Sequence, residues 1–523
     1  MATSRSSVAV VLDAMVSTHP CRSDSTTGLQ NARNAAGLPK DHHTEQQKIH
    51  SWLDNAHGRP AELVAAGLEA LDFVNLGVAI VDSARRLLSA NRTAEQILAS
   101  RDGLEVTVDG VLATFKRSSN PSLGTVIQQL CKDELNGKRS NKDAVLIVQR
   151  PSGKRPLTLL LRPLQSRRPR ERTTPTILVF ILDADLPLPT TESALRELYG
   201  FTFREARLAY LLMSGNTLED CCRSLQIRIS TGRMHLANLF VKTGVQRQGQ
   251  LVALLLKSLG MVCDSEMVHQ GAVPSAEPTQ PVVQPSRQSV TGSEIATAEL
   301  EALDLLNVGI AVINHLCKLL FANQTAQRIL ATGEGLCVTP DGVLNTLTQS
   351  CNPSLATFVQ QTLQRKARGR STVDTVLAVR RHSGKRPLVL LVRALCGWAQ
   401  SHPTAPAILI FVLDPELPVA TDESGLRQLF GFTSTEARLA RLLMEGNGLE
   451  ECCGQLEIRV PTGRKHLGNL FAKTGVQRQG QLISLLLKSV GMLRFQCGER
   501  VPKLLIAHDS HSAFSGREAQ HGR

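Results

Sequence analysis

The chain has 523 residues, which is enough for roughly three or four domains of ordinary size. Hydrophobic residues make up 42% of it and aromatic residues only 3%, so its cores must be built from Leu, Val, Ile and Ala. No run of about 18 or more apolar residues appears, which excludes an ordinary membrane-spanning helix, and a formal net charge of +13 favours a polyanionic partner.

Residues 1–60 are polar and lack sustained hydrophobic periodicity, so we expect them to be disordered. A helix is predicted between Asn91 and Ser100, where Ala94, Ile97 and Leu98 have helical spacing. A longer helix follows it. Short apolar runs around these helices predict strands at 77–81, 87–91, 144–148, 157–161 and 177–182. The order of elements describes a small α+β domain with an antiparallel sheet.

The next segment is helical throughout. Thr202 and Glu205 have the spacing of a capping box at the start of a helix that Gly215 ends. A second helix is predicted at 218–225, a third from Ser230 to Lys242, and a fourth at 248–259. Helix, tight turn, helix and a longer helix form a helix-turn-helix layout.

The same pattern then occurs a second time. Lys242 to Leu251 recurs letter for letter at Lys473 to Leu482, and the match extends over nearly the whole of both halves. A repeat this long is a duplicated module and not a solenoid unit. Four prolines between Cys263 and Gly292 predict an extended linker between the copies.

The helical segment resembles the LuxR-type four-helix DNA-binding domain. The first copy has Thr202-x-x-Glu205-Ala206, His235-Leu236 and Phe240-Val241-Lys242-Thr243-Gly244-Val245, and the second copy repeats these spacings from Thr433 to Val476. Each helical segment also carries a basic surplus, with nine positive residues against four negative ones in 195–262 and against five in 426–492. Such a surplus can neutralise several phosphates, so affinity for DNA should fall steeply with salt.

The resemblance implies which residues contact double-stranded DNA. Arg can make a bidentate contact to guanine and Asn to adenine. The base-reading candidates are Arg233, Met234, Ala237 and Asn238, with Arg464, Lys465, Gly468 and Asn469 in the second copy. The candidates for phosphate contacts are Lys242, Thr243, Arg247 and Gln248, with Lys473, Thr474, Arg478 and Gln479 in the second copy.

Two features of these segments stand out. The fourth helix is apolar around most of its circumference, which predicts a second buried surface; in the family it forms the dimer seam, so we expect an internal pseudo-dimer. Gly232 and Gly463 stand inside the third helix, where glycine costs about 1 kcal/mol relative to Ala. We therefore expect looser helices until DNA orders them. The adjacent pairs Cys221-Cys222 and Cys452-Cys453 indicate core packing, with redox sensing as the alternative.

The α+β segment resembles a PAS-type sensory domain, through the opening at 77–82, Asn91, the hairpin around Gly153 and Asp183. The resemblance implies a small-molecule or protein signal, or a docking role without a ligand, and no cofactor motif is evident. The fold class expected is thus α+β and all-α: two copies of a PAS-like domain followed by a four-helix domain. The domains are a disordered segment 1–60, PAS-like domain 61–190, helix-turn-helix domain 191–262, linker 263–294, PAS-like domain 295–420, helix-turn-helix domain 421–493 and tail 494–523.

The function predicted is sequence-specific transcriptional regulation in the cytoplasm of a bacterium, associated with the nucleoid and not with a membrane. No phosphate loop, metal-spaced carboxylates or nucleophile triad is present, so we expect neither an enzyme nor a metal site. The alternative is an interaction scaffold whose degenerate helix-turn-helix modules no longer read DNA sequence.

Overall fold

The computed structural model describes residues 67, 69–73, 76–115, 121–135, 143–164, 175–186, 192–259, 298, 300–347, 354–367, 375–395, 406–417 and 423–490. The segment 1–60, the linker 263–294 and the tail 494–523 lie outside the described residues. Within the described residues, no helix is both long enough and apolar enough to cross a membrane.

Five antiparallel strands form the first sheet, in the order β2-β1-β7-β6-β5. They are β1 (Gly77–Val81), β2 (Leu87–Ala90), β5 (Ala144–Val148), β6 (Leu157–Pro163) and β7 (Ile177–Leu182). The remaining elements are α5 (Arg92–Ala99), α6 (Leu123–Leu135) and a ribbon of β3 (Leu104–Val106) and β4 (Leu112–Thr114). The predicted strands and the helix after Asn91 are confirmed. The ribbon was not predicted, because three-residue strands are too short to show a period.

The second sheet repeats this topology, in the order β9-β8-β14-β13-β12. Its strands are β8 (Gly309–Asn314), β9 (Leu319–Ala322), β12 (Thr375–Val379), β13 (Leu388–Ala394) and β14 (Ala407–Leu413). Alongside are α14 (Gln324–Ala331), α15 (Leu355–Ala367), β10 (Leu336–Val338) and β11 (Leu344–Thr346). The protein is therefore mixed α/β with antiparallel sheets, as expected.

Both faces of each sheet are covered. On one face of the first sheet, Ala79 and Val179 belong to a core shared with α5 and α6. On the other face, Ile80 and Phe180 belong to a larger core that extends into the helices and the second sheet. Antiparallel sheets often leave one face to water. Burial on both faces explains why β7 is apolar at every position.

A buried asparagine anchors each sheet to the segment that precedes it. The Asn91 side chain caps α5 by accepting from Ala94 N at 3.0 Å, and it also accepts from Val78 N at 2.8 Å. Its Nδ2 donates to the carbonyls of Leu71 and Leu76. Asn323 makes the same four bonds in the second copy. One side chain thus satisfies four backbone groups that burial would otherwise leave unpaired.

Helices make up the rest of each half. The first set is α7 (Glu192–Tyr199), α8 (Phe203–Met213), α9 (Leu218–Ser224), α10 (Ile229–Thr243) and α11 (Gln248–Leu259). The second set is α17 (Glu423–Phe430), α18 (Ser434–Met444), α19 (Leu449–Gln455), α20 (Val460–Thr474) and α21 (Gln479–Val490). We call α8–α11 the first module and α18–α21 the second module.

The local signals are mostly confirmed. The capping box of Thr202 and Glu205 is present, and α10 ends at Gly244 in a left-handed conformation. Ser230, the predicted start of the third helix, is also a residue type that often caps helices, but it does not cap α10: the helix begins at Ile229, and its N-cap Arg228 makes no side-chain cap bond. Helices α7 and α17 were not predicted.

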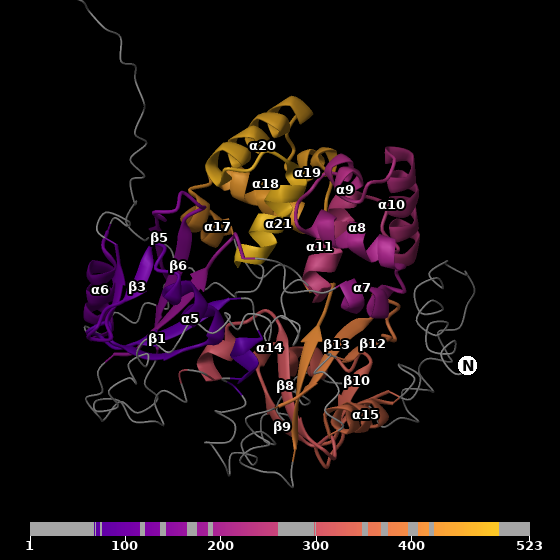
Figure 1. Cartoon of the computed structure of the whole chain (residues 1–523), viewed down its shortest axis with the longest axis horizontal. Coiled ribbons are helices and arrows are strands. Elements are labelled where there is room, and N and C mark those ends of the chain that lie inside the picture. The colour runs from indigo at the N-terminus through magenta and orange to yellow at the C-terminus, as the bar shows by residue number, and fades with distance from the viewer. Residues whose placement is uncertain are drawn as a thin grey trace, which may run out of the picture.

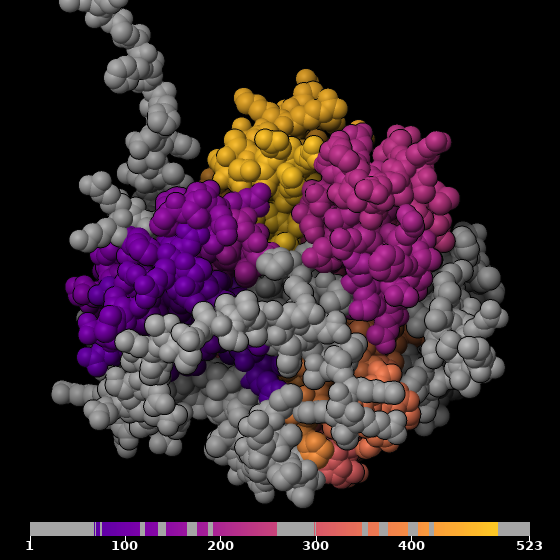
Figure 2. Space-filling model, in the orientation of Figure 1, coloured from indigo at the N-terminus to yellow at the C-terminus, as the bar shows by residue number. Residues whose placement is uncertain are grey.

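In each half of the chain, the helix that follows the sheet packs against the sheet of the other half, in a crossed packing. Helix α7 follows the first sheet in the sequence but packs against β12 of the second sheet, whereas α17 packs against β5 of the first. Figure 1 shows α7 over the second sheet, and α17 beside β5 and β6. The two modules lie side by side above the sheets (Figure 2). Each half is thus completed by the other.

Candidate nucleic-acid interface

The third helix of each module presents an exposed face. Arg233, Met234 and Ala237 of α10 are all exposed, although Met234 is a large apolar side chain with 53% of its surface accessible. The counterparts Arg464, Lys465 and Gly468 of α20 are exposed as well. Residues at positions i, i+1 and i+4 share one side of a helix. Asn238 and Asn469 are exposed too, so all eight predicted base-reading residues lie on open surface in two matching sets.

Two of the eight, Asn238 and Asn469, also donate a hydrogen bond to a buried carboxylate. Nδ2 of Asn238 donates to Oε1 of Glu205 at 3.2 Å, and Nζ of Lys242 donates to Oε2 of Glu205 at 2.7 Å. Lys242 also donates to the carbonyl of Gly200 at 2.8 Å. Glu205 is 2% exposed, and it closes the capping box of α8 as well. A single carboxylate thus fastens α10 to the start of α8.

The second module repeats this cluster around Glu436, with Asn469 at 3.0 Å and Lys473 at 2.7 Å. Burial alone would raise the pKa of Glu436, but hydrogen bonds from Lys473 and Thr433 outweigh it, and the pKa lies below its ordinary value. Glu205 shows the same balance, with bonds from Lys242 and Thr202. Both carboxylates are therefore charged at neutral pH.

Some of the residues predicted to contact phosphate are held by contacts within the protein. Lys242 and Lys473 are engaged by the buried carboxylates. The hydroxyls of Thr243 and Thr474 are buried and donate to backbone carbonyls one turn earlier, at 2.6 Å. Gln248 and Gln479 are half-buried at the first residues of α11 and α21.

Arg247 and Arg478 join the two modules. Nη1 of Arg247 lies 2.6 Å from Oε2 of Glu451 in α19, and Nη1 of Arg478 pairs with Asp220 in α9. A hydrogen bond from Thr217 and then the contact with Arg478 lower the pKa of Asp220 to about 2. The two ion pairs are related by the repeat, so they form a reciprocal clasp across the junction.

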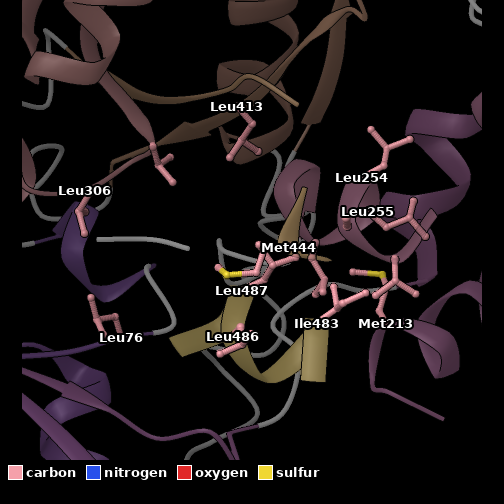
Figure 3. Close-up of a cluster of buried hydrophobic side chains, with 14 of the residues drawn as sticks. Leu76, Met213, Leu254, Leu255, Leu306, Leu413, Met444, Ile483, Leu486 and Leu487 are labelled. Atoms are coloured by element: carbon pink, nitrogen blue, oxygen red, sulfur yellow. The ribbon is translucent and has the colours of Figure 1, made fainter. Parts of the chain in front are cut away.

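The fourth helices form the centre of this junction. Helix α11 packs against α21, and ten apolar side chains of these two helices are at most 5% exposed and belong to one core. They are Leu251, Val252, Leu254, Leu255 and Leu256 with Leu482, Ile483, Leu485, Leu486 and Leu487. Met213 and Met444 border the same cluster (Figure 3). The second buried surface predicted for this helix is confirmed.

Two glycines allow the junction to close. A Cβ on Gly215 would lie 3.1 Å from Cα of Gln481, and one on Gly446 would lie 3.0 Å from Cα of Gln250. Both glycines also have positive φ, +89° and +93°. Only glycine combines that conformation with so close an approach.

The glycines inside the third helices have partners that explain them. A Cβ on Gly232 would stand 2.1 Å from Sγ of Cys222, and one on Gly463 would stand 2.2 Å from Sγ of Cys453. The sulfur atoms of Cys222 and Cys453 therefore occupy the space that a larger residue would need. The neighbouring Cys221 is fully buried, and burial raises the pKa of its thiol to about 12. The cysteine pairs pack in the core, and a protonated thiol is a poor redox sensor.

Sequence reasoning missed the partners of the two arginines. Asp220 and Glu451 stand at the same position in the two copies and are both acidic, as are Glu205 and Glu436. Preservation of charge between the copies was a usable signal. In the described part of the chain, no group of His, Cys, Asp and Glu could hold a metal ion.

The sequence matches no protein-family model, and no curated protein gives a significant match. Among solved structures, a VqmA dimer of Vibrio cholerae, described as a LuxR-type receptor in the absence of target DNA, is 20% identical. The match covers 34% of this chain and 81% of that one, with a TM-score of 0.15. A VqmA–ligand–DNA complex, also 20% identical, covers 37% and 87% with a TM-score of 0.17. An RNA-binding light-oxygen-voltage receptor, 13% identical, covers 65% and 93% with a TM-score of 0.21.

Proposed function

We propose that this chain is a sequence-specific DNA-binding transcriptional regulator. Residues 191–262 and 421–493 act as LuxR-type helix-turn-helix domains, and they form an internal pseudo-dimer through α11 and α21. Residues 61–190 and 295–420 act as PAS-like domains that receive a small-molecule or protein signal. The observation that carries the proposal is the pair of exposed basic helix faces beside an apolar junction between the two modules.

In this proposal α10 and α20 enter two successive major grooves. Arg233 and Arg464 make bidentate contacts to guanine, and their exposed neighbours contact the flanking bases. Two third helices one DNA turn apart would meet half-sites about 10 base pairs apart. Binding of this kind needs no catalytic group, so we propose a binding protein and not an enzyme.

Several of the residues predicted to contact phosphate are already engaged within the protein, so fewer of them are proposed to contact DNA. Lys242 and Lys473 act by holding the third helices in place, because their amino groups are engaged by Glu205 and Glu436. Arg247 and Arg478 act by holding the modules together. Gln248 and Gln479 remain the predicted side chains for phosphate contacts.

The crossed packing offers a route from the sheets to the modules. Nζ of Lys488, on α21, donates to the carbonyl of Leu186 at 3.3 Å, in the turn that follows β7 of the first sheet. Burial lowers the pKa of Lys488. Arg150 also bonds Asp183 at the start of that turn, at 2.8 Å. A signal that moves this turn would therefore act on the fourth helix directly.

The test is selection of bound sequences from a random DNA pool by the full-length protein at near-physiological salt. We expect a two-part motif with half-sites about 10 base pairs apart. Arg233→Gln and Arg464→Gln should each weaken binding to that motif by about 5- to 150-fold, the range for loss of one bidentate base contact. Lys154→Gln removes one charge from an exposed hairpin tip in the first sheet and is the matched control.

An interaction scaffold without DNA reading is the second candidate. Phe203 and Val241 favour it, because they are 64% and 71% exposed on the first module and suit an apolar partner. Its signature would be weak, salt-sensitive binding without an enriched motif, which Arg233→Gln and Lys154→Gln reduce equally.

A further inference from the structure

The two proposed reading helices carry different side chains. Arg233 and Arg464 are shared, but the next position is Met234 in α10 and Lys465 in α20, both exposed. One module thus presents an apolar group beside its arginine, and the other presents a second positive charge. An apolar side chain suits the methyl group of thymine, whereas lysine suits the O6 and N7 acceptors of guanine.

The first turns of these helices differ as well. Ser230 stands exposed in the first turn of α10, where Pro461 stands exposed in α20. Serine offers a hydroxyl and a backbone N–H at a helix end that has free donors, whereas proline has no N–H to offer. The two helices therefore differ in their donors as well as in charge.

The junction between the two modules also has different residues at one pair of repeat-related positions. Oγ of Ser484, on α21, donates to the carbonyl of Met213 in α8 at 2.7 Å. The repeat-related position on α11 is Ala253, which has no hydroxyl and lies 3.6 Å from the Cβ position of Gly446. Because both halves belong to one chain, every molecule presents one helix of each kind.

We propose that the DNA target is a two-part site with unlike half-sites, and that Met234 and Lys465 determine the difference. This inference rests on the proposed function. The first module reads a half-site in which a thymine flanks the guanine contacted by Arg233. The second module reads a half-site in which a further guanine flanks the one contacted by Arg464. A regulator made of two identical chains would instead select a palindrome, because its half-sites mirror its symmetry.

The experiment is selection from a random DNA pool with four full-length proteins: wild type, Met234→Lys, Lys465→Met and the double exchange. Wild type should enrich unlike halves. Met234→Lys should enrich two copies of the guanine-rich half, and Lys465→Met two copies of the thymine-containing half. Each single variant should prefer its own palindrome over the wild-type site by about 5-fold or more. The double exchange restores the net charge, and unlike halves should return.

The outcomes separate the inference from the proposed function. A palindromic motif for wild type would overturn the inference and leave the proposed function standing. So would single variants that change affinity through charge alone, tighter for Met234→Lys and weaker for Lys465→Met, with an unchanged motif. Absence of any enriched motif in all four proteins would overturn the proposed function and the inference with it.

Discussion

Replacement of Gly463 by alanine should destabilise α20 when residue 453 is cysteine and stabilise it when residue 453 is alanine. In an open helix site, Gly→Ala stabilises by about 1 kcal/mol. Here the new Cβ would lie 2.2 Å from Sγ of Cys453, which is 2% exposed. Overpacking of this kind costs about 1–3 kcal/mol. The expected net effect of Gly463→Ala alone is therefore a loss of about 1 kcal/mol.

The second variant removes the obstacle. Cys453→Ala alone should cost about 1 kcal/mol, since it deletes a buried sulfur. In that background Gly463→Ala should stabilise α20 by about 1 kcal/mol, which makes the coupling between the two positions about 2 kcal/mol. Gly468→Ala is the control. Gly468 lies on the same helix, and a Cβ there would meet nothing within 4 Å.

Hydrogen exchange of the α20 amides provides the measurement, because it reports the opening free energy of one element in a large protein. A change of 1 kcal/mol corresponds to about a fivefold change in exchange rate. Exchange should become faster in Gly463→Ala, and slower when the same change is made in the Cys453→Ala background. If Gly463→Ala had the same sign in both backgrounds, glycine would not be there to accommodate the sulfur.

Three further predictions concern the described contacts. Asn323→Ala should destabilise the second sheet by about 4 kcal/mol, at about 1 kcal/mol for each of four lost bonds, and urea unfolding should show this. The pKa of Glu436 is lowered in the folded protein, so its contribution to stability is complete above its ordinary value of 4.5 and is lost as pH falls through the lower folded value. Lys473→Met should move this acid-induced loss to higher pH in thermal scans, and an unmoved profile would contradict the pairing. Gly446→Ala should lower the melting temperature more than Gly475→Ala, because both have positive φ but only Gly446 faces a neighbouring backbone.

The sequence predicted most of the local structure correctly. The capping box of Thr202 and Glu205, the bounds of α11 and the buried strand β7 depend on short-range patterns that a single chain displays. The fold class was accessible because the order of these elements was clear.

The contacts between the two halves could not be predicted from such short-range patterns. Arg478 and Asp220 are far apart in the sequence, so no periodicity connects them. Lys242 was expected to contact phosphate because it is basic and stands at the end of the third helix, but its ion pair with Glu205 depends on how two helices meet. Helix α7 was missed because its eight residues bury only three side chains, and part of its packing is against a sheet from the other half.

The pairing of α11 with α21 sets a problem for synthesis on the ribosome. Leu482 follows Leu251 by 231 residues. At about 5–20 residues per second, the apolar seam of α11 therefore exists for roughly 10–45 seconds before its partner has been made. During that time the nearest complementary surface is the same half of another nascent chain. Folding in the cell should thus depend on chaperones that shield α11, and synthesis of many chains on one message should favour wrong pairs between molecules.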